Sequence, residues 1–493
     1  MNDFAKRIAA LSPEQRALFE LRLKQKELNL KNITSTSIPK RKASDVLSLS
    51  LIQERLWFLY QLQPDIPLYN ESNLFRITGN LKSIVLEQSL NEIIKRHEIL
   101  RTTFQTVDTQ LIQVIAPALT VTLPIIDLQD RSETEQAELV KQIVTEKSTQ
   151  PFDLSQGPLL QGTLIRLKHQ EHLMLLTMHH IISDGWSWRV FYRELGTLYQ
   201  AFCDGTTPAL PELPIQYSDF ALWQRQSLDD ETYKSQLVYW RQKLENLPPV
   251  LALPTDNPRP AVQSLRGARQ TLILPQSLTE ALKSLSQKEG VTLFMVLLAA
   301  FKTLLYRYTG QTDLVVGTPI ANRNQIETEN LLGCFINTLV LRTDVSNNPS
   351  FRELLARVRE TTLAAYAHQD LPFEQLVKEL QPERTLSYNP LFQTMFVFQD
   401  APLQALELPG LKLAPSIVDS GFAEFDLTLF LEDTKLGLMG ALEYNTDLFG
   451  ADTINRMIGH WQTLLAGIVS HPDENISKLP LLKSCTWKHG CQN

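Results

Sequence analysis

The stretch that organises the chain is Met178-His179-His180-Ile181-Ile182-Ser183-Asp184-Gly185-Trp186-Ser187. The apolar run at residues 173–177 comes directly before it and predicts a buried strand, because continuous hydrophobic segments are typical of strands covered on both faces. Asp184-Gly185 is a turn signal, and apolar residues then recur at helical spacing from residue 191 to residue 202. The stretch predicts a strand, a tight loop and a helix, and loops held by such rigid elements often carry catalytic groups.

The two adjacent histidines, His179 and His180, leave several roles open when they are considered alone. Both can be packing or hydrogen-bonding residues at a strand end. The common zinc motifs need a second His or Cys three to five residues away on a helical face, and the sequence has none there, so we expect no metal. Asp184 and Gly185 favour a functional loop, because a carboxylate can pair with an arginine and a glycine lets the backbone approach a substrate closely.

Length and composition restrict the class of protein. The chain has 493 residues, which is too long for one ordinary core at roughly 150 residues per domain. The net charge is −7 and the longest basic block is Lys40-Arg41-Lys42, so nucleic-acid binding is disfavoured. Apolar runs of about 18 residues are missing, which argues against a membrane span. Four cysteines without metal-ligand spacing fit a reducing compartment, and we expect a cytoplasmic protein.

Helical and strand patterns alternate along the chain and predict an α/β fold with two lobes of similar size. Helices are expected at 52–62, 86–97, 133–149, 230–246, 278–289, 293–308, 350–367 and 451–470. Strands are expected at 111–115, 120–126, 159–167, 172–178, 269–274, 313–318, 393–399, 425–431 and 436–444. A proline-rich passage at residues 247–260 is the strongest boundary signal, because prolines end helices and stiffen connectors.

The N-terminal region has its own pattern. Ser12, Pro13 and Gln15 predict the start of an amphipathic helix over residues 12–28, and residues 29–45 have linker composition. This segment is either a frayed extension or a docking helix for another chain. We therefore divide the chain into residues 1–44, a first lobe at 45–225, a second lobe at 226–485 and a tail at 486–493.

The quoted stretch resembles the His-His-x-x-x-Asp-Gly signature of nonribosomal peptide synthetase condensation domains, which are relatives of chloramphenicol acetyltransferase. Six further segments resemble the other motifs of that family in the right order, and they span nearly the whole chain. Ile52 and Cys334 depart from the usual residues at their positions. The six segments are 50–58 (SLIQERLWF), 96–104 (RHEILRTTF), 217–223 (YSDFALW), 333–342 (GCFINTLVLR), 368–374 (HQDLPFE) and 389–393 (NPLFQ).

The resemblance implies two chloramphenicol-acetyltransferase-like lobes in a V-shaped pseudo-dimer, with a tunnel between them that is open at both faces. It implies transfer of an acyl or peptidyl group from a carrier-protein thioester to the amine of an aminoacyl group on a second carrier protein. The 4'-phosphopantetheine arms belong to these carriers, and no covalently bound cofactor is expected. An adenylation domain and an upstream synthetase subunit, bound through the N-terminal helix, are further expected partners.

The resemblance also implies roles for the residues of the quoted stretch. His180 is expected to act as the general base or to position the amine, and a histidine with a pKa of about 6.5 suits proton transfer at neutral pH. His179 is expected to orient the loop, and Gly185 to offer its backbone N–H to the oxyanion. Asp184 is expected to hold the loop through an ion pair. The candidate partners of Asp184 are Arg101, Arg323 and Arg342.

Other residues receive supporting roles. Trp223, like the three arginines, is expected to support the site structurally. Ser187, Asn337 and Gly421 are expected to line the substrate tunnel, and the segments 317–323 and 421–426 to cross it or form its floor.

Alternatives within and outside the family stay open. An epimerisation domain needs a second acid/base group and a glutamate-bearing motif that the sequence does not present. An ester-forming member of the fold, or a catalytically idle docking and recruitment module, is also compatible with the motifs, although the intact His180, Asp184 and Gly185 favour chemistry. Within condensation, residues 338–342 and 185–187 most resemble the subtype that joins an L-configured donor to an L-configured acceptor.

Overall fold

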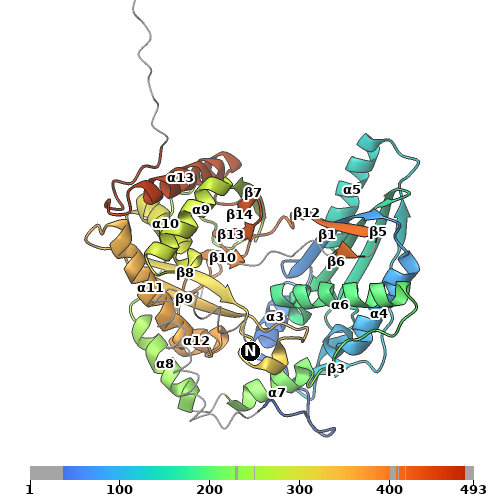
Figure 1. The fold of residues 1–493 in the computed structure, drawn as a ribbon. Helices are drawn as coiled ribbons and strands as arrows, with labels where there is room; N and C mark the ends of the chain where they lie inside the picture. The colour runs from blue at the N-terminus through green and yellow to red at the C-terminus, as the bar shows by residue number, and fades with distance from the viewer. Residues whose placement is uncertain are drawn as a thin grey trace, which may run out of the picture.

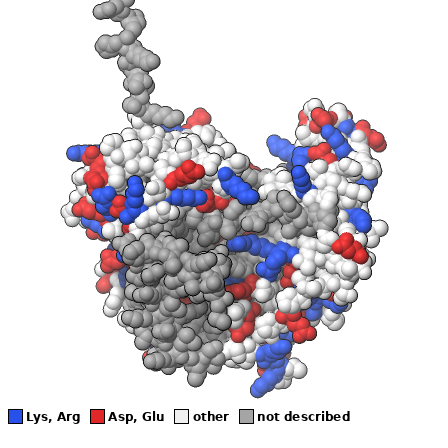
Figure 2. Space-filling model, in the orientation of Figure 1, with Lys and Arg blue, Asp and Glu red and all other residues white. Residues whose placement is uncertain are grey.

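The computed structural model describes residues 37–227, 231–248, 250–383, 385–399, 407–408, 410–416 and 418–482. These residues form two lobes, each built around a six-stranded sheet, and the lobes diverge toward the ends that carry α13 (Ala451–Ser470) and α5 (Glu133–Ser148) (Figure 1). Acidic and basic side chains are interspersed over the described part of the face shown in Figure 2. The predicted helix at 12–28 and the tail at 486–493 lie outside the described residues.

The first lobe contains the sheet that carries the histidines. Its strand order is β11-β12-β1-β6-β5-β4, and β6 pairs antiparallel with both β1 and β5, so the strands expected at 159–167 and 172–178 are confirmed and form a hairpin. The strands are β1 (Asn70–Gly79), β4 (Ile125–Asp127), β5 (Leu160–Lys168), β6 (Glu171–His179), β11 (Glu407–Leu408) and β12 (Leu411–Ser416), with a separate hairpin of β2 (Thr102–Val107) and β3 (Gln110–Ile115). The helices are α3 (Leu51–Leu62), α4 (Ser83–Arg96), α5, α6 (Gly185–Cys203) and α7 (Tyr217–Ser227).

The central part of strand β6, residues 173–176, is apolar at every position because both faces of the sheet are covered. Leu173 and Leu175 face the small core that includes residues of α5, while Met174, Leu176 and Met178 face the large core that contains residues of α4 and α6. Successive side chains of a strand point to opposite faces, so a strand between two layers needs apolar residues at every position. This packing fixes the end of β6, and with it the position of the histidines.

The second lobe has one large core. Its sheet has the order β7-β14-β13-β10-β8-β9, in which β10 is parallel to β8 and β13. Trp240, Leu251 and Leu253 join this core, so α8 (Glu231–Lys243) and the proline-rich connector pack on the second lobe. The strands are β7 (Gly267–Ile273), β8 (Asp313–Ile320), β9 (Asn337–Asp344), β10 (Thr394–Gln399), β13 (Leu427–Thr434) and β14 (Gly437–Asn445). The further helices are α9 (Gln276–Lys288), α10 (Leu293–Thr309), α11 (Phe351–Ala367), α12 (Phe373–Leu380) and α13.

Two segments of the second lobe's sequence cross into the first lobe. Strand β12 pairs antiparallel with β1 and lies against it in Figure 1. The buried side chains of Leu331, Leu332, Cys334 and Phe335 belong to the core of the first lobe. A division at residues 225 and 226 therefore does not separate the two sheets completely.

The predicted elements differ from the structure in several places. The strand expected at 120–126 is reduced to β4. The strands β1, β2, β9 and β12 and the helices α7 and α12 were not expected. Within the described residues, no single helix is long and apolar enough to cross a membrane. Helices α9 and α10 reach that length and apolar composition only when they are taken together, and the pair is bent by 106°.

Candidate active site

The histidine loop begins where β6 ends. His179 is the last residue of β6, and His180 opens a short 3-10 helix, η2 (His180–Ile182). The backbone N–H of His180 donates to the carbonyl of Tyr69, at 2.8 Å, which fastens the loop to the chain just before β1. Asp184 then caps the N-terminus of α6 by accepting from the N–H of Ser187, at 2.7 Å. The predicted sequence of strand, loop and helix is confirmed.

His179 lies in the packed interior. Its side chain is buried, and its Nδ1 accepts from the N–H of Ile181, at 3.1 Å. The rings of Tyr69 and Phe152 pack around it. Burial, with a smaller contribution from the neighbouring His180, lowers the pKa of His179 to about 3. A neutral ring in this environment orients the loop and does not carry protons at neutral pH.

His180 is partly accessible, with 21% of its side chain exposed. Its Nδ1 lies 2.6 Å from the carbonyl oxygen of Ser183, so Nδ1 carries a hydrogen and donates it. In the neutral ring, Nε2 then holds the lone pair. This tautomer presents Nε2 as the nitrogen that can accept a proton from a substrate.

Two opposing effects act on the pKa of His180. Burial acts to lower the pKa, but the Glu71 carboxylate, 3.8 Å from Nδ1, acts to raise it, and the net result is a pKa well above the usual value. The sulfur of Cys334 also lies 3.8 Å from Nδ1. Burial raises the pKa of the Cys334 thiol, so this group is neutral at pH 7 and Glu71 is the charged neighbour.

Asp184 pairs with Arg323. Arg323 Nη2 donates to Asp184 Oδ1 at 3.1 Å, and the side chains of Asp184 and Arg323 are 0% and 2% exposed. The other carboxylate oxygen accepts from the N–H of Phe335, at 2.9 Å, and the Ser187 hydroxyl lies 2.8 Å from Oδ1. Asp184 is therefore a buried anchor that joins the loop of the first lobe to a segment from the second.

Arg323 is itself held from several sides. Its Nη1 donates to the carbonyls of Leu331, at 2.8 Å, and Thr328, and its guanidinium lies 4.0 Å from the centre of the Phe335 ring. Such contacts suit the planar, weakly hydrated guanidinium better than an ammonium group.

The other two candidate arginines bind elsewhere. Arg342 pairs with Asp313, with 2.7 Å between Nη2 and Oδ2, and Arg101 donates to the carbonyl of Ala116 and lies 3.7 Å from Glu98. The predictions that Arg101 or Arg342 pairs with Asp184 were wrong, because each arginine is held by its own neighbours at a different place in the fold. Trp223 is half-buried and packs against the core of the first lobe.

The residues expected to line a tunnel have other contacts. The buried Ser187 hydroxyl lies 2.8 Å from Asp184 Oδ1 and 2.8 Å from the carbonyl oxygen of Gly333. Asn337 is also buried, and its amide group donates to the carbonyls of Gln369 and Leu371 at 2.9 Å each. These two side chains belong to the framework, which corrects their assignment as lining residues. Gly421 has a positive φ of 75° and open space where a Cβ would lie.

Sequence reasoning missed a polar group at the junction of the lobes, which we call the seam cluster: Arg55, Tyr69, Glu374 and Glu424. Arg55 lies 2.8 Å from Glu424 Oε1 and 3.9 Å from Glu374 Oε1, and the Tyr69 hydroxyl donates to Glu424 at 3.3 Å. Burial acts to lower the pKa of Arg55, but Glu424 and the other acceptors raise it overall. Burial raises the pKa of Glu374 against the influence of Arg55. Arg55 lies in the first motif and Glu374 in the sixth, so their positions were known but their pairing was not.

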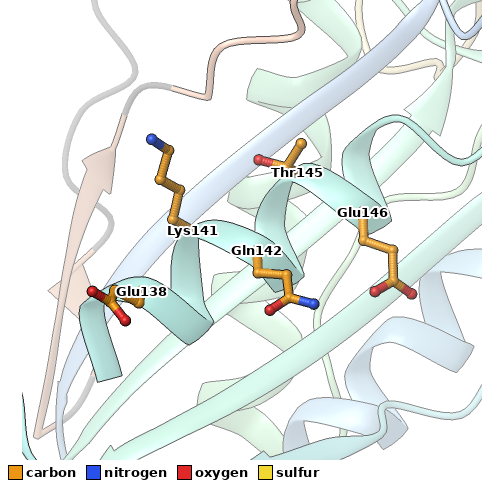
Figure 3. A pocket seen from close by; sticks show the side chains of 5 residues that line it. All are labelled: Glu138, Lys141, Gln142, Thr145 and Glu146. Carbon is orange, nitrogen blue, oxygen red and sulfur yellow. The ribbon is translucent and has the colours of Figure 1, made fainter. Parts of the chain in front are cut away.

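A surface hollow lies away from these residues. It has a volume of about 540 Å³ and runs along one side of α5 (Figure 3), lined by Glu138, Lys141, Gln142, Thr145 and Glu146. Helix α5 packs on the opposite face of the sheet from α6, so the sheet separates this hollow from the histidine loop. The hollow is formed by one helix face, and we assign no site to it.

Comparison with known proteins gives the family. The model of the Condensation domain family matches residues 43–487. This chain belongs to the condensation domain family. The condensation domain is 49% identical over 462 residues to a component of the linear gramicidin synthase of Brevibacillus parabrevis, covering 93% of this chain and 6% of that protein. It is 42% identical over 492 residues to phosphinothricin tripeptide synthetase PhsC of Streptomyces viridochromogenes, covering 99% of this chain and 45% of that protein. The condensation domain thus spans less than half the length of each of these synthetases.

Solved structures agree on the fold. The X-domain from teicoplanin biosynthesis superimposes with a TM-score of 0.82 at 29% identity, covering 90% of this chain and all of that one. The four-domain nonribosomal peptide synthetase AB3403, bound to AMP and glycine, gives a TM-score of 0.80 at 25% identity over 92% of this chain and 35% of that one. The predicted fold is confirmed: the lobes have the chloramphenicol-acetyltransferase-like fold of condensation domains.

Proposed function

We propose that this condensation domain forms an amide bond between a carrier-bound acyl or peptidyl thioester and the amine of a carrier-bound aminoacyl group. The observation that carries the proposal is the His180 imidazole, whose Nδ1 is held by the Ser183 carbonyl so that Nε2 is the nitrogen available to a substrate. Amide formation from a thioester is downhill, so the reaction requires no nucleotide at this site.

The chemistry follows from the attack of a neutral amine on the thioester carbonyl. The adduct carries a proton on nitrogen that must leave before the carbon–sulfur bond breaks. His180 Nε2 takes this proton as general base and returns it to the sulfur of the departing pantetheine thiol. A group in this role must come within roughly 2.6–3.2 Å of the amine nitrogen in the reactive complex.

Gly185 is proposed to stabilise the oxyanion of the adduct. It is the first residue of α6, where backbone N–H groups lack intrahelical acceptors and the helix dipole is positive. An added Cβ at Gly185 meets only the Gln399 side-chain nitrogen, at 3.9 Å, so protein packing does not require a glycine here. Close approach of the substrate gives a reason for it.

The partners proposed are two carrier proteins whose 4'-phosphopantetheine arms reach His180 from opposite faces of the junction between the lobes. The curated relatives are large synthetases, which supports carriers as partners. An L-configured donor and an L-configured acceptor are the proposed substrates, and an adenylation domain and an upstream synthetase are further proposed partners. Ile38 is buried in the core of the first lobe, so a docking segment must lie before it.

The test is a condensation assay with two separately loaded carrier proteins. His180→Ala should lower the rate at least about 100-fold, because a positioned acid/base group contributes 10²–10⁴-fold. The matched control is His169→Ala, which removes an exposed histidine from the turn between β5 and β6 and should leave the rate unchanged. Equal rates for His180→Ala and the wild type would remove His180 from the mechanism.

A further inference from the structure

Glu71 lies behind the His180 imidazole and contacts three parts of the loop. It sits near the start of β1, opposite Met178 of β6. Its Oε2 accepts from the Ser183 hydroxyl at 2.6 Å and from Trp188 Nε1 at 3.2 Å. The same oxygen lies 3.8 Å from His180 Nδ1. One carboxylate oxygen thus connects β1 with the loop, with the imidazole and with α6.

The other charged or titratable groups near His180 are neutral or already paired. His179 and Cys334 are neutral at pH 7, and burial together with Glu71 raises the pKa of Tyr192 on α6 well above its usual value. Asp184 is paired with Arg323. Among the described residues, Glu71 supplies the carboxylate that lies within 4.0 Å of an imidazole nitrogen of His180.

We propose that Glu71 is a positioning residue that holds the His180 ring with Nε2 toward the substrate and stabilises the imidazolium formed when Nε2 takes up a proton. This inference deepens the proposed function and rests on it. Ser183 contributes to this arrangement, because its carbonyl accepts a hydrogen bond from His180 Nδ1 and its hydroxyl donates one to Glu71. Glu71 acts through His180 and does not contact the reacting atoms.

In the proposed reaction no proton passes to or from Glu71. When the adduct's nitrogen–hydrogen bond breaks, its electron pair stays on nitrogen and the proton goes to Nε2. When the carbon–sulfur bond breaks, the same proton moves from Nε2 to sulfur and the thiol leaves. Nδ1–H stays on the Ser183 carbonyl in both steps, so no proton passes to Glu71. Its negative charge favours the cationic ring between these two steps.

Removing the charge should therefore lower the pKa of His180. An opposite charge at 4–6 Å shifts a pKa by about 1–3 units, so Glu71→Gln should lower the His180 value by about one unit or more. Condensation that needs neutral Nε2 rises with pH through this pKa. The rising limb of the rate profile should move to lower pH in the variant by the same amount.

The direct measurement is an NMR titration of ring-labelled histidines, with His180→Ala assigning the His180 signal. Glu71→Gln should shift the titration midpoint of His180 downward, while Trp188→Phe, which removes one hydrogen bond to Glu71 and keeps the charge, should shift it less. Glu87→Gln is the matched control, since Glu87 lies on α4 and accepts from the N–H of Leu123. An unchanged His180 midpoint in folded Glu71→Gln would overturn the inference.

A second variant and a parallel assay distinguish the possible outcomes. If Glu71→Gln does not fold, Glu71→Asp retains the charge at a greater distance and should give a smaller downward shift, and no shift in that variant counts against the inference. The condensation assay is run in parallel. A shifted His180 midpoint in a chain that forms no amide supports the role of Glu71 and refutes the proposed function. Normal condensation with an unshifted His180 midpoint supports the proposed function and refutes the role of Glu71.

Discussion

Among the described residues, two arginines form ion pairs that join the lobes of this condensation domain, and the two sites are built differently. The Asp184–Arg323 pair is fully buried, and the backbone N–H groups of Ser187 and Phe335 share the carboxylate. In the seam cluster, the side chains of Arg55 and Glu424 are 29% and 26% exposed. A fully buried charge depends on its partner for nearly all of its stabilisation, while a half-buried charge can replace part of a lost partner with water.

The difference indicates two kinds of junction. The Asp184–Arg323 pair holds the histidine loop in a single arrangement, because any movement leaves a charge in a dry environment. The seam cluster can lose a contact at little cost, so it permits adjustment between α3 of the first lobe and the segments of the second lobe that carry Glu374 and Glu424. Rigid support beneath the loop and a softer contact beside it suit a site whose geometry is kept while the two lobes adjust to each other.

The largest expected effect is on the Asp184–Arg323 pair. Arg323→Met leaves the Asp184 carboxylate buried without its cation, and we expect a loss of about 3–5 kcal/mol in the free energy of unfolding. Arg55→Met is the matched variant and should cost about 1 kcal/mol or less. Chemical denaturation of both measures the difference. The double variant Asp184→Asn with Arg323→Met should recover part of the lost stability. Equal losses for Arg323→Met and Arg55→Met would contradict the difference between the buried pair and the seam cluster.

Lys302 provides a second kind of buried charge, a cation whose hydrogen bonds to described residues go to neutral groups. Its Nζ donates to the Leu341 carbonyl at 2.6 Å and to the Thr343 hydroxyl at 2.8 Å, inside the core of the second lobe. Burial, with a contribution from Lys243, lowers the pKa of Lys302 to about 7. Hydrogen bonds to neutral groups therefore do not replace an ion pair.

The pH dependence of stability tests this statement. The pKa of Lys302 is about 7 in the folded chain, whereas an unfolded lysine titrates near 10.4. Between these values the unfolded state binds more protons, so the stability of the folded state rises with pH. The wild type should gain a few kcal/mol relative to Lys302→Met between pH 7 and pH 10, measured by denaturation at each pH. Parallel curves for the two chains would show that Lys302 titrates normally.

The elements that the sequence predicted best are those with a strong local pattern. Strand β6 was predicted because both of its faces are apolar, and α6 because apolar residues recur at helical spacing after the turn signal of Asp184-Gly185. Strand β1 was missed because its first four residues are half-buried and polar, with alternation only from Phe75 onward. Strand β12 has six residues, and its pairing with β1 joins positions more than 300 residues apart.

The candidate site was predictable to the extent that it is local. His179, His180, Asp184 and Gly185 lie within seven residues of one another. The partner of Asp184 could only be narrowed to three arginines, because Arg323 is 139 positions away and reaches Asp184 through a segment that packs into the other lobe. Glu71 was missed for the same reason, since only the pairing of β1 with β6 brings it to His180.

The smallest expected effect concerns the seam cluster and its response to salt. Glu424→Gln keeps an acceptor for the Tyr69 hydroxyl but removes the charge that faces Arg55, and we expect a loss of about 0.2–1 kcal/mol in the free energy of unfolding at low ionic strength. The Debye length falls to about 3 Å at 1 M salt, so a half-buried pair that water reaches is largely screened and most of the difference from the wild type should disappear there. The loss caused by Arg323→Met should persist at the same salt concentration, because the Asp184–Arg323 pair is closed to solvent. A Glu424→Gln effect that survived 1 M salt would show that the seam cluster is as rigid as the buried pair.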